Sequence, residues 1–216
     1  MDIETYAKLH PKTGHAIILP VTLKRISTLP KGSIILDIGC AEGETIFWLE
    51  SQFPKKYKYI GIDLSETRIK CANKKKNTNS RFFVSSATNL SQIRSSSIDF
   101  ALCSQVIEHV DHDELLVSEL SRILRKGGRF QLDTVFKKWW AKYFYNSPSG
   151  WALDPTHVRE YQNLTELRKM FERNLSVTDV ILKQVFRNLR LIHPSFPKIN
   201  LKILGYYTVF ILGKKL

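Results

Sequence analysis

The sequence predicts an α/β fold with a doubly wound, mostly parallel sheet. The apolar run at 34–36 is followed at once by Asp37, and a second run at 57–62 ends in Asp63. Helical patterns follow both runs, and the order returns after a third apolar run at 98–104. Strand and helix patterns that alternate in this way are typical of right-handed parallel crossovers.

Length and charge limit the classes of function. With 216 residues and 43% hydrophobic composition, the chain can bury one substantial core. The formal net charge of +13 indicates an anionic partner, such as nucleic acid, a phospholipid surface or an acidic substrate.

The three cysteines are odd in number, which favours a reducing compartment over a disulfide framework. The N-terminus lacks a signal-peptide profile, and no apolar run reaches the roughly 18 residues that span a bilayer. We therefore expect a cytoplasmic protein that can make peripheral contact with a membrane.

The turn after the first strand has the character of a ligand-binding loop. Gly39 and Gly43 permit torsions that other residues avoid, and they let a ligand lie against the main chain. A dinucleotide fingerprint would need glycine where Ala41 and Glu44 stand. Glu42 and Glu44 would also place negative charge beside a pyrophosphate. The loop therefore favours a cationic ligand without phosphate.

This loop resembles the first motif of the class I S-adenosylmethionine-dependent methyltransferases, with alanine in place of the central glycine. The resemblance implies a Rossmann-like methyltransferase fold, in which a seven-stranded, mostly parallel sheet carries an antiparallel last strand. It implies S-adenosyl-L-methionine as the cofactor, with these loop residues at its site: Asp37, Gly39, Cys40, Ala41 and Gly43.

On this interpretation residues 1–216 form a single methyltransferase domain. Its expected parts are an N-terminal arm and helix (1–32), a cofactor-binding core (33–135), a lid segment (136–163), and a C-terminal helix and strands (164–216).

Asp63 is the candidate ribose ligand. It lies about twenty residues beyond Gly43, near the spacing at which an acid meets a ribose in such folds. The alternative is that Asp63 caps a helix starting near Ser65. Taken with the Gly39 loop, ribose binding is favoured, and Asp63 and Leu64 are assigned to the cofactor site.

Two further strand ends complete the predicted cofactor site. After the third strand, expected at 81–85, the family carries an acid and a small residue that read the adenine edge. Those positions fall on Ser86 and Ala87, so a hydroxyl replaces the acid. After the fourth strand, Ser104 and Gln105 would border the methionine end.

The segment after the fourth strand carries the candidate chemistry. Gln105, Glu108 and His109 are spaced to share one helical face beyond the strand end, where ligands collect in open α/β sheets. The string resembles the Glu-x-x-Glu-His element of ubiquinone-biosynthesis-type (type 11) O-methyltransferases and of small-RNA 3′-end 2′-O-methyltransferases. In those families this element and a later histidine, here at the position of His157, bind a divalent metal.

The substitution of an amide for the first acid weakens the case for a metal. Gln105, Glu108, His109 and His157 would make a poor Mg²⁺ site, because that ion prefers hard, charged oxygen ligands. The favoured interpretation is that Glu108 or His109 shapes the substrate pocket, with His109 or His157 as general base, since histidine titrates near physiological pH.

The remaining elements follow from hydrophobic pattern and turn signals. An imperfect helix is expected at 15–29, interrupted by Pro20, and glycine should cap the helix at 113–125. Helices and strands are further expected at 44–50, 65–75, 130–135, 164–173, 175–182 and 206–212, with 187–204 as a connection.

The lid segment is aromatic and basic between 137 and 145, and Trp151 follows. Such a segment indicates a lid over the acceptor, an interfacial helix or a base-stacking platform, with burial in the core as the alternative. Apolar and basic residues alternate again between 186 and 203, which could lie on an anionic membrane.

The sequence thus predicts a methyltransferase that acts on an oxygen or nitrogen nucleophile of a small or lipid-like acceptor. An RNA methyltransferase of the 2′-O type is the alternative, motivated by charge and by the Glu-His resemblance. A non-catalytic S-adenosylmethionine-binding protein is a third class, and the presence of Asp37 and Asp63 argues against it.

Overall fold

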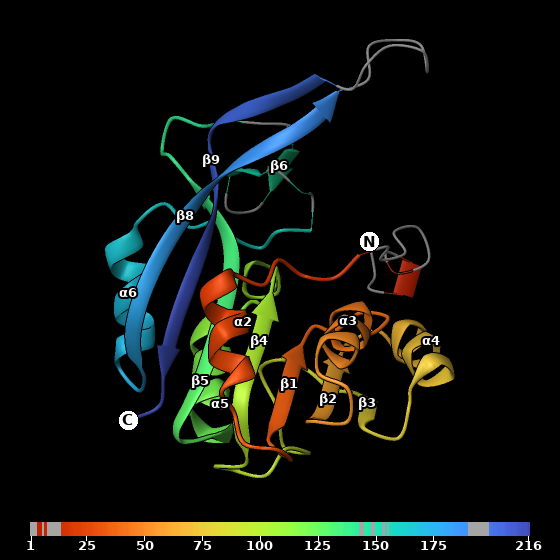
Figure 1. Cartoon of the computed structure of the whole chain (residues 1–216). Coiled ribbons are helices and arrows are strands. Elements are labelled where there is room, and N and C mark those ends of the chain that lie inside the picture. Colours follow the sequence, from red (N-terminus) through yellow and green to blue (C-terminus); the bar gives the residue numbers. More distant parts are fainter. Residues whose placement is uncertain are drawn as a thin grey trace.

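Seven strands form one sheet at the centre of the molecule (Figure 1). The computed structural model describes residues 4–5, 7, 14–142, 145–147, 150–152, 154, 156–189 and 199–216. The strand order is β3-β2-β1-β4-β5-β9-β8. The strands are β1 (Ile34–Ile38), β2 (Lys58–Asp63), β3 (Ser80–Val84), β4 (Ile98–Ser104), β5 (Leu124–Lys137), β8 (Ser176–Leu189) and β9 (Ile199–Lys214).

The direction of the strands confirms the predicted topology. β1 to β5 are mutually parallel, and β9 pairs antiparallel with both β5 and β8. The chain moves outward from β1 to β3 and then returns to β4 on the other side of β1. Ligands bind in open sheets outside the carboxyl ends of the strands at such a switch point.

Helices cover both faces of the sheet (Figure 1). One hydrophobic cluster joins α2 (Pro20–Ser27), α3 (Glu44–Gln52) and α4 (Glu66–Lys75) to one face, where Ile35 lies. The other cluster joins α5 (Asp113–Ile123) and α6 (Leu164–Glu172) to the face that carries Leu36. Because neighbouring strand residues point to opposite faces, β1 is buried on both sides.

Three expectations about the elements were wrong. Pro20 begins α2 instead of interrupting it, since the first turn of a helix needs no proline N–H. Glycine does not cap α5, because the chain leaves the helix at Leu124 in an extended conformation and Gly127 turns later. The stretch 187–204 is not all connection, since β8 runs to Leu189 and β9 starts at Ile199.

The carboxyl side of the sheet bears two antiparallel pairs. β8 and β9 remain paired to Leu189 and Ile199 and project beyond the parallel strands, and β6 (Tyr145–Ser147) pairs with β7 (Gly150–Ala152) beside them (Figure 1). Among the described residues, no helix is both long and apolar enough to cross a bilayer.

Candidate functional site

The loop between β1 and α3 has the tight geometry that its sequence predicts. Gly39, Ala41 and Gly43 have φ values of 75°, 48° and 88°, which lie in the left-handed region that favours glycine. A Cβ added at Gly39 would collide with Cγ2 of Val106. The loop therefore passes close to the segment that follows β4.

The amide groups of this loop point into the protein. The N–H groups of Gly39 and Cys40 both donate to the carbonyl oxygen of Ile62 at 2.8 Å, and Ala41 N–H donates to Asp63 Oδ2 at 2.9 Å. Gly43 N–H donates to the carbonyl of Cys40. A pyrophosphate site needs such amides to face the ligand, so this arrangement supports the choice of a ligand without phosphate.

Asp63 binds the N-cap residue of α4 and also faces a cavity. Its Oδ1 accepts from the Ser65 N–H at 2.9 Å, and Ser65 Oγ in turn caps α4 by accepting from Arg68 N–H at 3.3 Å. Each carboxylate oxygen can accept more than one hydrogen bond. The cap of α4 is therefore Ser65, and Asp63, which does not cap the helix itself, stays the candidate ribose ligand.

A cavity of about 350 Å³ opens at the carboxyl ends of β1, β2 and β4. Seven of the predicted cofactor residues line it: Gly39, Asp63, Leu64, Ser86, Ala87, Ser104 and Gln105. The other four, Asp37, Cys40, Ala41 and Gly43, are buried and lie outside this lining. Burial also raises the pKa of the Cys40 thiol.

The sequence did not single out several residues of this cavity. Ile62, Arg68, Ser85, Val106, Val110 and Thr156 also line it. Val106 and Val110 flank the Glu-His pair, so their position in the string was the available signal. Thr156 lies in the segment after β7, and its position next to His157 was the only signal for it in the sequence.

Asp133 fixes the end of β4 from the neighbouring strand. Its Oδ2 accepts from Ser104 Oγ at 2.9 Å and from Gln105 Nε2 at 3.1 Å. Gln105 has a φ of 52°, which is unusual for a residue with a side chain, and its N–H donates to the Asp133 carbonyl. A buried carboxylate that sequence reasoning missed therefore positions two cavity residues.

The expected helical face at Gln105, Glu108 and His109 was wrong. Residues Ile107–His109 form a single 3₁₀ turn, and Val110 is already extended. Gln105 and His109 therefore line the cavity, whereas Glu108 points inward and is fully buried. The left-handed residue at position 105 prevents a continuous helix.

Glu108 occupies a low-dielectric position. Its Oε2 accepts from Thr134 Oγ1 at 2.9 Å, and Oε1 has no hydrogen-bond partner among the described residues. Burial raises the pKa of Glu108 to about 7, although His157 nearby opposes the shift. Near neutral pH this carboxyl group therefore holds its proton part of the time.

The orientation of His109 follows from the chemistry of its partner. His109 Nδ1 lies 3.1 Å from the carbonyl oxygen of Thr156, which can only accept. Nδ1 therefore carries the proton, and in the neutral ring Nε2 is the basic nitrogen. The Asp154 carboxylate holds Thr156 in turn, by accepting from its Oγ1 at 2.6 Å.

His157 lies beside His109, as the resemblance implies, but it belongs to a buried polar network. The two ring centroids are 4.9 Å apart. His157 Nδ1 is 2.7 Å from Glu160 Oε1, and Glu160 Oε2 contacts Lys137 Nζ at 3.2 Å and accepts from the Tyr206 hydroxyl at 3.0 Å. This network, missed from the sequence, holds the lid segment against β5 and β9.

The grouping of acid and histidines does not fit a magnesium ion. Ligand atoms of Glu108, His109 and His157 lie within 4.8 Å of one another. Glu108, however, is the only carboxylate of the group, and its Oε2 already accepts from Thr134, while Gln105 is oriented by the bond from its Nε2 to Asp133. Mg²⁺ requires several hard oxygen ligands and keeps waters of its own, and two imidazoles with one such carboxyl do not supply them.

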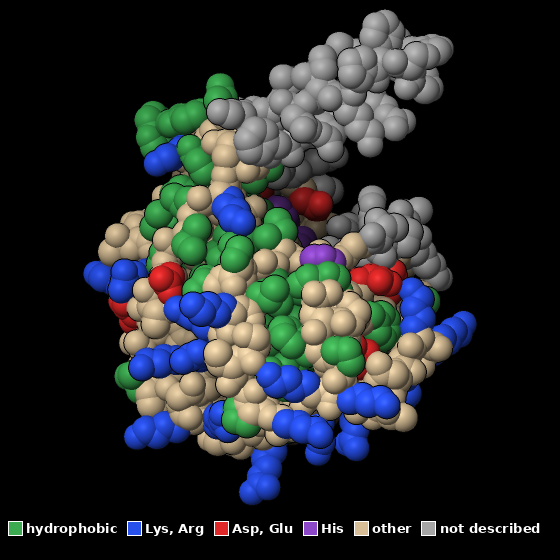
Figure 2. All heavy atoms as spheres, in the orientation of Figure 1, with side chains coloured by type: hydrophobic (Ala, Val, Ile, Leu, Met, Phe, Trp, Pro, Cys, Tyr) green, Lys and Arg blue, Asp and Glu red, His purple; other side chains and the backbone are tan. Residues whose placement is uncertain are grey.

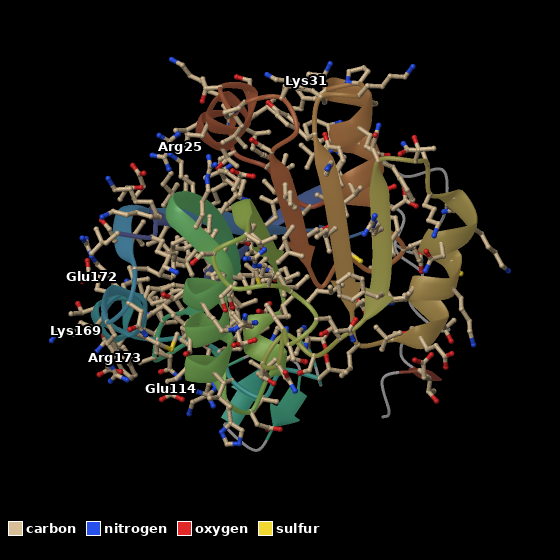
Figure 3. All side chains as sticks on the ribbon, turned by 90° about the horizontal axis from the view of Figure 1, so that it is seen from below. Arg25, Lys31, Glu114, Lys169, Glu172 and Arg173 are labelled. Atoms are coloured by element: carbon tan, nitrogen blue, oxygen red, sulfur yellow. The ribbon has the colours of Figure 1, made fainter. Side chains whose placement is uncertain are left out.

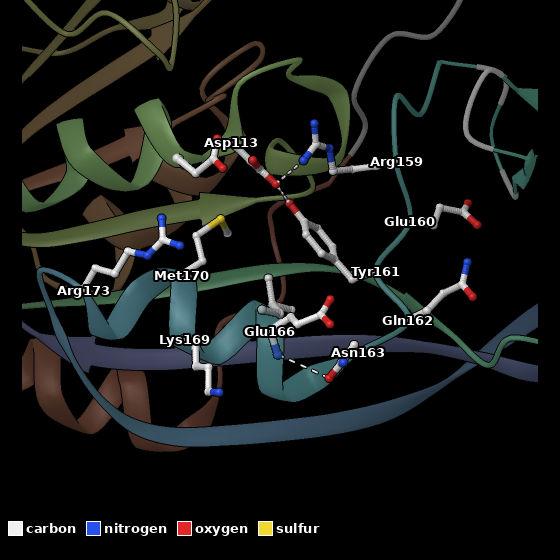
Figure 4. A pocket seen from close by; sticks show the side chains of 12 residues that line it. Asp113, Arg159, Glu160, Tyr161, Gln162, Asn163, Glu166, Lys169, Met170 and Arg173 are labelled. Atoms are coloured by element: carbon white, nitrogen blue, oxygen red, sulfur yellow. Dashed lines mark hydrogen bonds and ion pairs between the residues drawn. The ribbon is translucent and has the colours of Figure 1, made fainter.

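A second cavity of about 510 Å³ lies between α5, α6 and residues 159–163 (Figure 4). Its floor is an ion pair, in which Arg159 Nη1 contacts Asp113 Oδ2 at 2.7 Å while the Tyr161 hydroxyl donates to the same oxygen. Charges of both signs surround it, and it contains no glycine loop. The carboxyl-edge cavity is therefore the better candidate for the donor.

Known proteins with similar sequences are methyltransferases. Residues 36–132 match the family described as "Methyltransferase domain". The tRNA (carboxymethyluridine(34)-5-O)-methyltransferase alkbh8 of Xenopus tropicalis is 28% identical over 139 residues, which cover 58% of this chain and 20% of that protein. The ubiquinone biosynthesis O-methyltransferase of Xanthomonas axonopodis pv. citri (strain 306) is 26% identical over 121 residues, which cover 54% and 49%. The chain thus spans about half or less of the length of these two relatives.

Solved structures share the fold. The YcgJ protein of Bacillus subtilis has a TM-score of 0.67 at 18% identity, over 90% of this chain and 96% of that one. A geranyl diphosphate methyltransferase, solved in complex with S-adenosylmethionine, has a TM-score of 0.65 at 15% identity, over 90% and 82%. Residues 36–132 thus match a methyltransferase domain, and the similarity to these solved structures shows that the chain shares their fold.

Proposed function

We propose that the chain transfers the methyl group of S-adenosylmethionine to an oxygen or nitrogen nucleophile of a small or lipid-like acceptor. The observation that carries this proposal is the carboxyl-edge cavity, where Asp63 faces a space bordered by a loop whose amides point away from it. A carboxylate suits ribose hydroxyls, and the missing amides disfavour a diphosphate.

The residues of the cavity divide into binding and reacting groups. When bound, S-adenosylmethionine supplies an electrophilic methyl group that is activated by its own sulfonium. Asp63 would accept from the ribose, and Leu64, Ser86 and Ala87 would border the adenine. The protein mainly aligns the two reactants and excludes water, and such orientation can lower a barrier by about 7 to 11 kcal/mol.

His109 is the better of the two candidate bases. It lines the cavity and its Nε2 is the basic nitrogen, so it can take the proton of an acceptor hydroxyl or amine. His157 is buried and its Nδ1 is bonded to Glu160. We therefore propose that His157 positions the ring of His109, and that the buried Glu108 helps to shape the pocket.

Two classes of methyl acceptor are candidates, a small or lipid-like molecule and RNA. A small or lipid-like acceptor suits the apolar, aromatic segment that follows β5, where Trp139 and Trp140 are exposed. The exposure of these two rings argues against their burial in the core. RNA is the second candidate, because alkbh8 is a tRNA methyltransferase and the chain carries a net charge of +13.

Calorimetric titration of two aspartate variants tests the donor site. Asp63→Ala should weaken S-adenosylmethionine binding about 30-fold or more, because two hydrogen bonds of about 1 to 1.5 kcal/mol each are lost. Asp99→Ala is the matched control, since Asp99 also is buried and accepts a backbone N–H, from Ile34, but lies at the opposite edge of the sheet.

The control variant should keep its donor affinity within about threefold. Equal losses in both variants would mean that Asp63 acts through stability alone. Preferential binding of NADH by the unmodified protein would remove the proposal. For the acceptor, RNA binding that weakens steeply with added salt would favour the second candidate.

A further inference from the structure

We propose that the surface beside the projecting strands docks onto an anionic phospholipid bilayer. The docking patch consists of Lys138, Trp139, Trp140, Lys142 and Leu204. The inference concerns where the protein works and does not depend on methyl transfer, so it can fail or hold independently of the proposed function.

Contacts with β9 bring the members of the docking patch together. Lys138 N–H donates to the carbonyl of Gly205 at 2.8 Å, and the ring of Trp140 lies over the same glycine. Ala141 packs in a cluster with Tyr206. Trp139, Lys142 and Leu204 are immediate chain neighbours of these contacts, so the two segments that carry the patch lie side by side.

The apolar members of the patch face water. Trp139 is 80% exposed, Leu204 63% and Trp140 47%. Hydrophobic side chains gather on the part of the molecule that β8 and β9 extend (Figure 2). Tryptophan is enriched where proteins meet the headgroup region, and an apolar patch rimmed by polar residues marks an interaction site.

The two chain segments that supply the docking patch carry most of the positive surplus of the sequence, although Lys214 and Lys215 lie at the opposite end of β9. Residues 134–153 and 180–216 contain ten Lys and Arg and no Asp or Glu. The rest of the chain has 23 basic against 20 acidic residues. The two segments thus account for most of the net charge of +13. Each basic residue near an anionic membrane contributes about 1 kcal/mol of attraction.

A bilayer suits this surface better than RNA does. Nucleic acid would pair with the lysines and could stack on the tryptophans, but it would leave the aliphatic Leu204 in water. The acyl boundary of a membrane covers tryptophan and leucine alike, while the lysines remain among the phosphates. The patch is also joined to the site, since Tyr206 next to it donates to Glu160 of the buried network.

Vesicle sedimentation with charge-matched variants tests the proposal. The unmodified protein should bind vesicles of phosphatidylcholine and phosphatidylglycerol at least tenfold more tightly than phosphatidylcholine alone. Lys138→Glu with Lys142→Glu, and separately Trp139→Ala with Leu204→Ser, should each weaken that binding about tenfold or more. All of these residues are exposed, so the variants should fold, and retained S-adenosylmethionine binding would verify it.

Lys31→Glu with Lys58→Glu is the control with the same change of charge. Both lysines are exposed at the amino edge of the sheet, opposite the projecting strands, and Figure 3 shows Lys31 on that side. The control should bind vesicles within about threefold of the unmodified protein. An equal loss of vesicle affinity in the control would mean that net charge alone, and not the docking patch, determines binding. Displacement from vesicles by RNA, with RNA binding lost in the patch variants, would assign the surface to nucleic acid and overturn the proposal.

Discussion

The sheet differs between its β1–β4 side, where we propose that the donor binds, and the side from the end of β5 onward, where we propose that the acceptor binds. We call these two parts the cofactor half and the acceptor half. In the cofactor half, from β1 to β4, polar side chains and loop amides are committed to contacts within a few strands, such as Asp63 with Ala41 and Ser65. In the acceptor half, from the end of β5 onward, charged and polar side chains form a buried network, in which Lys137 and Tyr206 both contact Glu160.

The difference indicates where binding of a common ligand restricts the choice of residue. A loop that must pass close to a donor leaves little choice of residue, and the match to the methyltransferase domain accordingly covers residues 36–132. The acceptor half carries the charge, the exposed tryptophans and the buried network. Variants that break one half and spare the other can test this division.

The largest effect is expected at the junction of the halves. Lys137→Met removes the cation from a buried ion pair and should lower the free energy of unfolding by about 3 to 4 kcal/mol. The remaining contacts of Glu160 with His157 and Tyr206 keep the loss from being larger. Urea denaturation measures it.

A second substitution, at Glu160, separates the effect of the Lys137–Glu160 ion pair from the effect of leaving one charge buried alone. Lys137→Met combined with Glu160→Gln should recover part of the lost stability, because no uncompensated charge remains. Arg168→Met provides the comparison, since it breaks the exposed pair with Glu172 and should cost less than about 1 kcal/mol. Similar costs for the buried and exposed pairs would contradict the central place given to this network.

The next effect depends on pH. The pKa of Glu108 is about 7 in the folded protein against an ordinary value of 4.5, so the folded state holds the proton more tightly than the unfolded state does. The contribution of this group to stability is greatest below about pH 4.5 and falls by about 3 kcal/mol as the pH rises to about 7. Glu108→Gln removes this titration.

Denaturation of both proteins between about pH 5 and pH 8 measures the difference. Glu108→Gln should gain stability relative to the unmodified protein as the pH rises, because its amide cannot ionise while its oxygen can still accept from Thr134. A difference that stays constant over this range would show that burial does not control the ionisation of Glu108.

Two glycines with similar torsions test the loop of the cofactor half. Gly32 has a φ of 86° with no atom within 4 Å of an added Cβ, so Gly32→Ala should cost about 1 kcal/mol from torsion alone. Gly39→Ala should cost about 2 kcal/mol and weaken donor binding at least tenfold, because its Cβ would press on the stiff side chain of Val106. Equal stabilities with unchanged donor affinity would refute the close approach.

The sequence predicted the cofactor half because its signals are local. The strand ends at Asp63 and Ser104 and the helix cap at Ser65 follow from short patterns, and the structure agrees with them. The local error in this region was the face shared by Gln105, Glu108 and His109. The spacing of these residues suggested a helix there, but the structure has a left-handed torsion at position 105 followed by a 3₁₀ turn.

The acceptor half was predicted less completely because its polar contacts involve residues outside any recognisable motif. Nothing local marks Asp133 as the partner of Ser104 and Gln105, or Glu160 as the partner of Lys137. Such pairs follow from strand order and register, which a single sequence does not specify. The family resemblance implied that His157 lies near His109, as the structure shows, but it gave no information about Glu160.

The smallest effect is expected where the two halves touch at the surface. Arg25 of α2 contacts Asp179 of β8, with Nη2 and Oδ2 2.9 Å apart and both side chains partly exposed. A double-mutant cycle with Arg25→Ala and Asp179→Ala should give a coupling energy of about 0.5 kcal/mol, which decreases as salt is added. The Lys70–Glu66 pair within α4 is the exposed reference. If the Arg25 coupling instead exceeded about 2 kcal/mol and resisted salt, a charge contact at the surface would hold the halves together in addition to the strand ladders.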